Sequence, residues 1–307
     1  MDKSIFDQFR LTVMERGLGV VGLNLYVKGQ EQVSHFWEDM TRECLYSGSK
    51  TFTSVAAGIC QDEGRFALTD KIVDFFPEYK SVYSEGVEEI TLRDLLHMSS
   101  GMLEFLMVPD DPAMQQEDWA ETFFKRPLLQ KPGEGSFFYS NPCTYMVGRA
   151  IEKVSGQNVR DFLMPRLFDK LSIPNPQWHT CPKGHSIAAS ALYLNTLEFA
   201  RLGEMLVNGG VYQGQRIVSE EYVKAMYSDI VDTSYFSFPN QDMEAKMGYG
   251  YQVWRCVRPN TYRADGLYGQ FCIIALDKDA VVTVTSHEEK RANDIVRAAC
   301  ADIIDRL

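Results

Sequence analysis

Long hydrophobic runs are missing from this sequence. None of the 307 residues belongs to an apolar stretch that approaches the ~18 residues needed for a membrane-spanning helix. The first segment, residues 1–17, is charged throughout and lacks both the continuous apolar region and the small-residue cleavage site of a secretory signal. The sequence therefore predicts no membrane partner and, if Met1 is the native start, a protein that stays in the cytoplasm.

Clusters of positive charge are missing as well. The chain has 31 Lys and Arg against 42 Asp and Glu, a formal net charge of −11 at pH 7. An acidic chain repels phosphate backbones and anionic lipid surfaces, so we expect no nucleic-acid partner. The seven cysteines are scattered and form no CxxC pair, which is typical of reduced thiols in the cytoplasm rather than of a disulfide framework.

The chain also lacks internal repeats, low-complexity stretches and flexible linkers, which favours one compact unit. Its two ends are rich in β-type residues. An N-terminal hairpin is predicted around the turn at 28–30, and further strands are predicted between 249 and 286. The middle is mostly helical, with a capping box predicted at Thr91 and Asp94.

These patterns predict an α+β fold, an antiparallel β-sheet flanked by helices, in a single domain over residues 1–307. Residues 1–65 and 236–307 are expected to form the sheet lobe. Residues 66–235 are expected to form an inserted, mainly helical lobe.

Ser47-Gly48-Ser49-Lys50 is the first motif whose side chains could take part in catalysis, and it lies where the predicted hairpin ends and a helical pattern begins. A serine hydroxyl is a weak nucleophile until another group removes its proton. Residues three apart lie on one helix face, so Lys50 could serve Ser47. A helix N-terminus also offers N–H groups to developing negative charge. The alternative is an ordinary helix start with a surface lysine, because Ser-x-x-Lys also arises by chance.

Tyr139-Ser140-Asn141 is the second motif. A lysine close to a tyrosine favours the phenolate, so Tyr139 could have a lowered pKa and relay the serine proton. In the alternative interpretation, Tyr139 is a semi-buried aromatic residue before a helix whose cap is Ser140 or Asn141.

The order and spacing of several segments form a stronger pattern than any one of them. Ser47–Lys50 is followed by Leu95–Met102 (LLHMSSGM), by Tyr139–Asn141 and by the glycine-rich Asp265–Gln270. In this arrangement the chain resembles the class C β-lactamase-like serine hydrolases. That group includes penicillin-binding DD-peptidases, family VIII-type esterases and 6-aminohexanoate oligomer hydrolases, and the resemblance extends over nearly the whole chain.

The resemblance implies catalytic roles for four side chains. Ser47 matches the serine that is acylated, and Lys50 matches the lysine that keeps it activated. Tyr139 matches the tyrosine that acts as a base in acylation and helps to activate water in deacylation. Asn141 matches the asparagine that bonds both the lysine and the substrate amide. Whether Lys50 or Tyr139 is the immediate proton acceptor stays open, because the two groups titrate together.

The third family motif is where this sequence departs. β-Lactamases of the group carry Lys-Thr-Gly on an edge strand, where the lysine helps to bind the substrate carboxylate. The matching stretch here is taken as Leu267-Tyr268-Gly269, followed by Gln270. The resemblance implies that Gly269 allows close approach and that the N–H groups of Ser47 and Gln270 form the oxyanion hole. Without the lysine, carboxylate-bearing β-lactams should be less favoured, and Arg263 is the candidate replacement.

Aromatic residues near these motifs are expected to contact the substrate, namely Tyr268, Trp178 and Phe138, together with Gly269. His97 is expected to pack rather than to act as a base. We predict no metal site and no cofactor, because the acyl-transfer mechanism needs neither. His179, Cys181 and His185 lack a nearby fourth ligand and are expected to form a loop beside the pocket.

The sequence therefore predicts a serine hydrolase that forms an acyl-enzyme on Ser47 and hydrolyses a small ester or amide. One alternative is a β-lactamase or DD-peptidase that acts on β-lactams or peptidoglycan-like peptides. An alternative of another class is a non-catalytic, ligand-binding member of the fold. The expected partner is the small-molecule substrate, and the sequence favours no particular oligomeric state.

Overall fold

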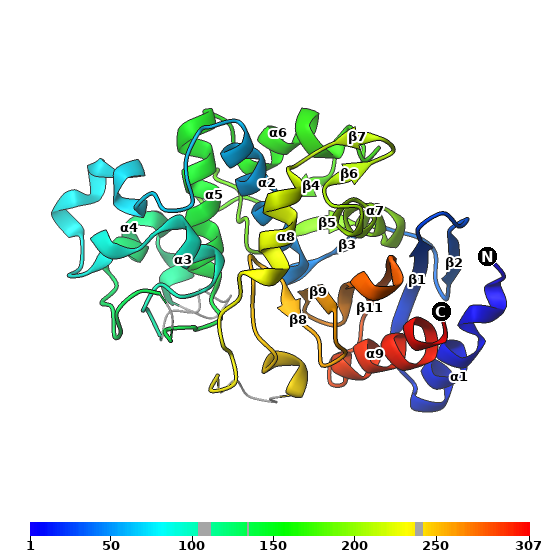
Figure 1. Ribbon diagram of the computed structural model, residues 1–307. Helices are drawn as coiled ribbons and strands as arrows, with labels where there is room; N and C mark the ends of the chain where they lie inside the picture. The colour runs from blue at the N-terminus through cyan, green and yellow to red at the C-terminus, as the bar shows by residue number, and fades with distance from the viewer. Residues whose placement is uncertain (104–111, 134, 237–241) are drawn as a thin grey trace.

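A six-stranded antiparallel sheet lies at the centre of the computed structural model, which describes residues 1–103, 112–133, 135–236 and 242–307 (Figure 1). The strand order is β2-β1-β11-β10-β9-β8. Both chain ends contribute, as predicted, because β1 pairs with β11 over Val20–Val27 and Ala280–Ser286. The other strands of this sheet are β2 (Val33–Phe36), β8 (Trp254–Arg255), β9 (Thr261–Gly266) and β10 (Gln270–Ala275).

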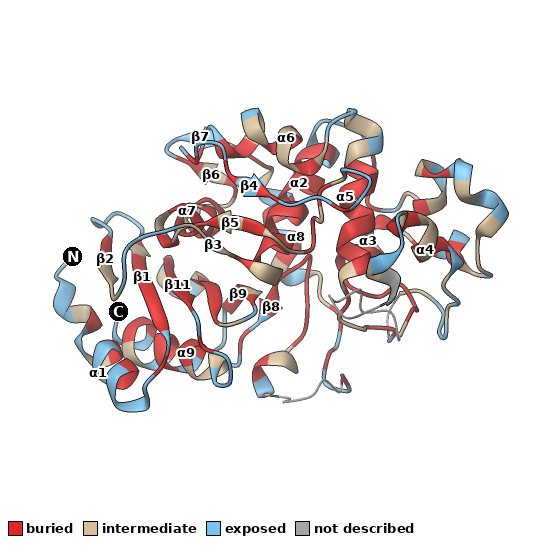
Figure 2. Ribbon diagram, turned by 180° about the vertical axis from the view of Figure 1, so that it is seen from behind, coloured by how far each residue is buried: buried red, intermediate tan, exposed pale blue. Residues whose placement is uncertain are grey.

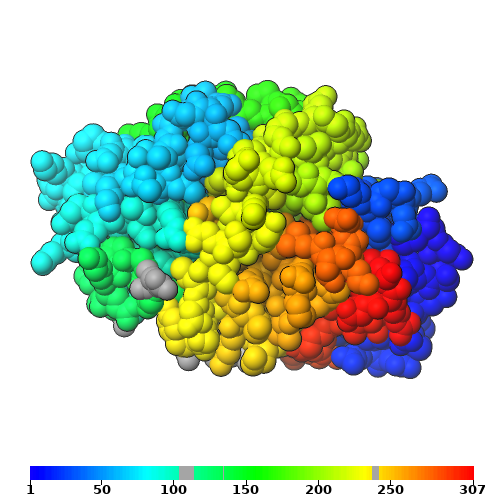
Figure 3. All heavy atoms as spheres, viewed as in Figure 1, coloured from blue at the N-terminus to red at the C-terminus, as the bar shows by residue number. Residues whose placement is uncertain are grey.

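One face of the sheet is covered by α1 (Asp7–Arg16) and α9 (Ala292–Ala298), which lie side by side in Figure 1. Phe9 on α1 and Ile295 on α9 join Phe271 and Ile273 of β10 in one buried cluster. This alternation along β10 is the period-two pattern of a strand buried on both faces. Figure 3 shows the N-terminal and C-terminal segments together at one end of the molecule, and Figure 2 shows the central strands as buried.

The opposite face of the sheet is covered by α7 (Thr196–Val207). Gly203 permits this contact, because a Cβ at that position would lie 2.4 Å from Cys272 Sγ and 2.5 Å from Val281. Asn195 caps the helix through a capping box with Glu198. Helix α7 falls inside the range predicted for the helical lobe, yet it packs on the sheet.

The remaining helices form the other part of the molecule around α2, whose residues from Ser49 to Cys60 are all buried. The predicted capping box is present, with the Asp94 N–H donating to Thr91 Oγ1 at 3.0 Å. These helices are α2 (Ser49–Asp62), α3 (Leu92–Leu96), α4 (Trp119–Lys125), α5 (Asn141–Ser155), α6 (Val159–Leu163) and α8 (Glu220–Ser228).

Two small sheets lie beside the main sheet. The first has the order β3-β5-β4 and consists of Glu43–Cys44, Leu192–Leu194 and Gln177–Trp178. Its strand β3 leads directly into the turn before α2. The second is the hairpin of β6 (Val211–Tyr212) and β7 (Gln215–Arg216). In the described part of the chain, no helix is long and apolar enough to cross a membrane.

Candidate active site

Ser47 lies in a 3-10 turn, Tyr46–Gly48, immediately before α2 begins at Ser49. The Gly48 N–H donates to the Leu45 carbonyl at 2.8 Å and closes the turn. Tyr46 has φ 46°, a left-handed conformation that is strained for a residue with a side chain. Such strain next to a reactive group is a common feature of functional sites, because the surrounding packing must hold it in place.

Lys50 is buried beside Ser47, with a relative exposure of 1%. Its Nζ donates to Ser47 Oγ at 2.9 Å, to Asn141 Oδ1 at 2.7 Å and to the Ala189 carbonyl at 2.8 Å. Burial lowers the pKa of Lys50 to about 7, although the carboxylate of Asp265 raises it. A buried amine with such a pKa can exist in its neutral form near pH 7 and accept a proton.

Tyr139 completes a trio with Ser47 and Lys50. Its side chain hydrogen-bonds Ser47, and Lys50 Nζ lies 5.1 Å from the centre of its ring. The lowered pKa expected for Tyr139 is wrong, because burial raises the pKa of the phenol above its ordinary value. The ring packs 5.2 Å from Trp254 and 5.8 Å from Tyr249, centre to centre. Burial outweighs the side-chain hydrogen bonds with Ser47 and Trp254, which lower the pKa of Tyr139.

Tyr139→Phe should reduce hydrolysis by about 10²-fold, because the ring would still pack while the hydroxyl that contacts Ser47 would be gone. The measurement is kcat/KM with a neutral ester. Tyr249→Phe, which makes the same change in the neighbouring buried ring, is the control and should leave kcat/KM within about threefold of wild type. A threefold or smaller loss in Tyr139→Phe would assign the proton transfer to Lys50 alone.

Asn141 is the first residue of α5, and Ser140 is the N-cap of that helix. The structure thus brings Asn141 to Lys50 from a distant part of the chain, as the resemblance implied. Ala189, which also accepts from Lys50, had no recognisable signal in the sequence because it contributes only a backbone carbonyl.

Of the two glycines in this stretch, Gly266 rather than Gly269 lies against the nucleophile turn. A Cβ on Gly266 would lie 2.1 Å from the Leu45 carbonyl oxygen and 3.1 Å from the Gly48 nitrogen, both in the segment that carries the nucleophile. A Cβ on Gly269 would instead meet Ser286 at 3.0 Å, and the buried side-chain amide of Gln270 donates from Nε2 to the Ser286 carbonyl. This geometry favours the residue after Gly266, the exposed Leu267, over Gln270 as the second oxyanion-hole donor.

The expected substrate-binding aromatics lie at different depths. Tyr268 has φ 64°, and its ring meets that of Tyr46 edge to face at 5.1 Å, so it stands beside the nucleophile turn. Phe138 is partly buried, and its ring lies 6.1 Å from that of Phe236. Trp178 is buried and donates from Nε1 to the Ser190 carbonyl at 2.9 Å, next to Ala189, so it supports the wall of the site from behind.

Arg263 is not available as a replacement cation. Its guanidinium is buried and bonds Asp265 Oδ2 from Nε at 2.8 Å and Glu244 Oε2 from Nη1 at 3.3 Å. His97 is packed, as expected, and its Nε2 lies 2.8 Å from the Asp229 carbonyl oxygen. Within the described residues, no group of three or more His, Cys, Asp and Glu side chains is arranged to hold a metal ion.

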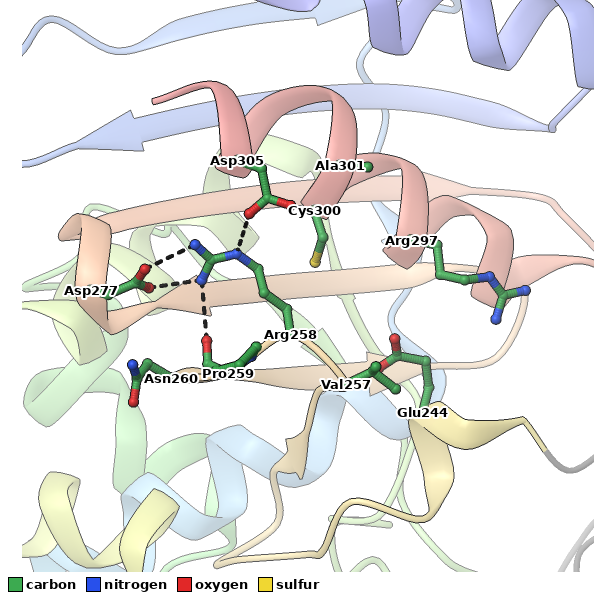
Figure 4. Close-up of a pocket in the computed structure, with 10 residues that line it drawn as sticks. All are labelled: Glu244, Val257, Arg258, Pro259, Asn260, Asp277, Arg297, Cys300, Ala301 and Asp305. Atoms are coloured by element: carbon green, nitrogen blue, oxygen red, sulfur yellow. Dashed lines mark hydrogen bonds and ion pairs between the residues drawn. The ribbon is translucent and has the colours of Figure 1, made fainter.

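A pocket of about 540 Å³ opens elsewhere, between α9 and the start of β9 (Figure 4). Its lining includes Asn260, which directly precedes β9, whereas Gly266 ends that strand, roughly 20 Å further along the extended chain. Arg258 in this pocket already bonds Asp277 Oδ1 at 2.7 Å and Asp305 Oδ1 at 2.7 Å. This pocket is therefore separate from the catalytic residues.

The family described as Beta-lactamase matches residues 13–302. The chain belongs to this Beta-lactamase family. Among solved structures, this family member is similar to EstCE1, a hydrolase with promiscuous acyltransferase activity, with a TM-score of 0.78 at 14% identity over 98% of both chains. It is also similar to a penicillin-binding protein homologue from Caulobacter crescentus, with a TM-score of 0.75 at 18% identity over 97% of this chain and 96% of that one. These likenesses establish the fold.

Two curated relatives of this Beta-lactamase family member have named activities. A lovastatin esterase from Penicillium rubens is 26% identical over 188 residues, 54% of this chain and 46% of the relative. A 6-aminohexanoate-dimer hydrolase from Paenarthrobacter ureafaciens is 24% identical over 219 residues, 66% of this chain and 56% of the relative. The matches therefore span about half the length of the curated relatives.

Proposed function

We propose that this Beta-lactamase family member is a serine hydrolase that forms an acyl-enzyme on Ser47 and transfers the acyl group of a small ester or amide to water. The observation that carries the proposal is the position of Lys50, buried and within hydrogen-bond distance of both Ser47 Oγ and Asn141 Oδ1. The names of the esterase and the amide hydrolase among its relatives point to the same chemistry.

The chemistry follows from this arrangement in two steps. Ser47 Oγ attacks the carbonyl carbon while its proton passes to the Lys50–Tyr139 pair, and the pair then protonates the leaving alcohol or amine as its bond to the carbonyl breaks. In the second step water attacks the acyl-enzyme ester and gives a proton to the same pair. The bond between Ser47 Oγ and the acyl carbon then breaks, the pair returns the proton to Oγ, and the carboxylic acid leaves. The backbone N–H groups of Ser47 and Leu267 would stabilise the oxyanion in both steps.

Carboxylate-bearing β-lactams are the second candidate substrates, since the family has this activity. Arg263, the candidate replacement for the motif lysine, is already paired with Asp265 and Glu244 and is not available to them. We therefore place β-lactam hydrolysis second.

All seven cysteines are free thiols, which suits a reducing compartment, and we assign the activity to the cytoplasm.

A fluorophosphonate and a small substrate panel test the proposal. We expect one covalent adduct in the intact mass spectrum, at Ser47, and faster turnover of a p-nitrophenyl ester than of a cephalosporin. Failure of any dose to label the wild-type protein would favour a non-catalytic binding protein. Faster turnover of the cephalosporin would favour the β-lactamase alternative.

The pH dependence of kcat/KM should report on Lys50. Its pKa of about 7 means that the neutral amine becomes the main form above that value. Because the neutral amine is the form that accepts a proton, kcat/KM for a non-titrating ester should rise as the pH increases through about 7. A profile that is flat between roughly pH 5.5 and 9 would exclude this role for the amine.

A further inference from the structure

The strand edge next to Ser47 is only partly covered. Strand β8 pairs with β9 at Trp254–Arg263 and Arg255–Tyr262, whereas β9 continues to Gly266. Gly266 lies against the backbone of the nucleophile turn. The last residues of β9 therefore extend beyond β8 towards Ser47, and Asp265 lies within this stretch.

Asp265 and Arg263 form an ion pair whose two members differ in exposure. Asp265 Oδ2 accepts from Arg263 Nε at 2.8 Å, and the side-chain exposures are 24% for Asp265 and 2% for Arg263. The carboxylate is thus the more accessible member of the pair, and the guanidinium is buried. Arg263 also bonds the buried Glu244, so two carboxylates share one guanidinium and leave one negative charge.

This negative charge is felt at the catalytic residues. The carboxylate of Asp265 raises the pKa of Lys50 and also that of Tyr139. Lys50 is itself buried, and its pKa of about 7 means that it carries only part of a full positive charge at pH 7. A substrate carboxylate entering here would meet repulsion, whereas an ammonium group would gain an accessible counter-ion in a site with restricted access to water.

We propose that Asp265 binds a positively charged amino group of the substrate, so that the preferred substrates are esters or amides that carry an ammonium group a few bonds from the scissile carbonyl. This inference rests on the proposed hydrolase function. It makes Asp265 a determinant of specificity, in the middle position of the Ala264-Asp265-Gly266 stretch that lies beside the nucleophile.

Three p-nitrophenyl esters that differ mainly in charge test the proposal on the wild-type protein. They are the 4-(trimethylammonio)butanoate, its neutral carbon isostere 5,5-dimethylhexanoate, and the anionic monoglutarate. We expect kcat/KM to be at least tenfold higher for the cationic ester than for the neutral one, and lowest for the anion. The preference should weaken as the salt concentration increases.

Asp265→Asn should bring the ratio of cationic to neutral kcat/KM to within about twofold of one, while turnover of the neutral ester persists. Glu43→Gln, which makes the same change in a carboxylate paired with His287 at 3.5 Å, is the control and should keep the wild-type ratio. The wild-type series keeps the proposal testable if Asp265→Asn does not fold. A neutral or anionic preference in wild type overturns the role of Asp265 and leaves the hydrolase function intact. Absence of both turnover and fluorophosphonate labelling overturns the hydrolase function itself.

Discussion

Ser47→Ala is expected to reduce ester hydrolysis by at least ~10⁴-fold, because the variant lacks the hydroxyl on which the acyl-enzyme is proposed to form. The remaining rate would come only from substrate binding and the oxyanion hole. The variant should also lose the fluorophosphonate adduct, which the intact mass would reveal directly. Steady-state kinetics with the neutral p-nitrophenyl ester measures the effect.

The same variant should unfold at nearly the wild-type temperature. Ser47 accepts one of three hydrogen bonds from Lys50, and the other two, to Asn141 and Ala189, remain. Ser49→Ala is the matched control, because Ser49 Oγ accepts from the Leu192 N–H at 3.1 Å and takes no part in the proposed chemistry. Hydrolysis retained in Ser47→Ala, or lost equally in Ser49→Ala, would contradict the assignment of the nucleophile.

The sheet could be predicted from the sequence because its strands carry regular patterns near both ends of the chain. Prediction was less accurate at the start of the stretch between 249 and 286, where strands were expected, because only Trp254–Arg255 pairs with β9 there. Tyr249, which precedes these two residues, forms a β-bridge with Val231 instead of pairing with β9. Such long-range competition for backbone pairing leaves no local signature.

The candidate site shows the same division between local and long-range information. The spacing of Ser47 and Lys50 is local, and the hydrogen bond between them follows from one helical turn. The direction of the Tyr139 pKa shift is set by burial of the phenol, which only the folded chain produces. The sequence likewise offered two glycines in the β9–β10 hairpin, and only the fold distinguishes the one that meets the nucleophile turn.

Lys50→Met is expected to reduce kcat/KM by about 10³-fold or more. Methionine is unbranched and similar in length to lysine, so it should fill the buried space but can neither accept the serine proton nor hold Asn141. The carbonyl oxygens of Asn141 and Ala189 would lose their donor, at a cost of about 1–3 kcal/mol for each group left unsatisfied. Removal of an ionisable group from a buried position offsets part of this loss. Lys170→Met, on an exposed lysine, is the control and should keep wild-type activity.

The pH profiles of Lys50→Met and Tyr139→Phe together identify the proton acceptor. Burial sets the pKa of Lys50 near 7 and raises that of Tyr139 above its ordinary value, so only the amine changes its charge near neutral pH. If Lys50 is the acceptor, the residual activity of Lys50→Met no longer rises through pH 7, whereas Tyr139→Phe keeps that rise at a lower rate. If the rise near pH 7 persists in Lys50→Met, the titrating group lies elsewhere, and the proposed role of the buried amine fails.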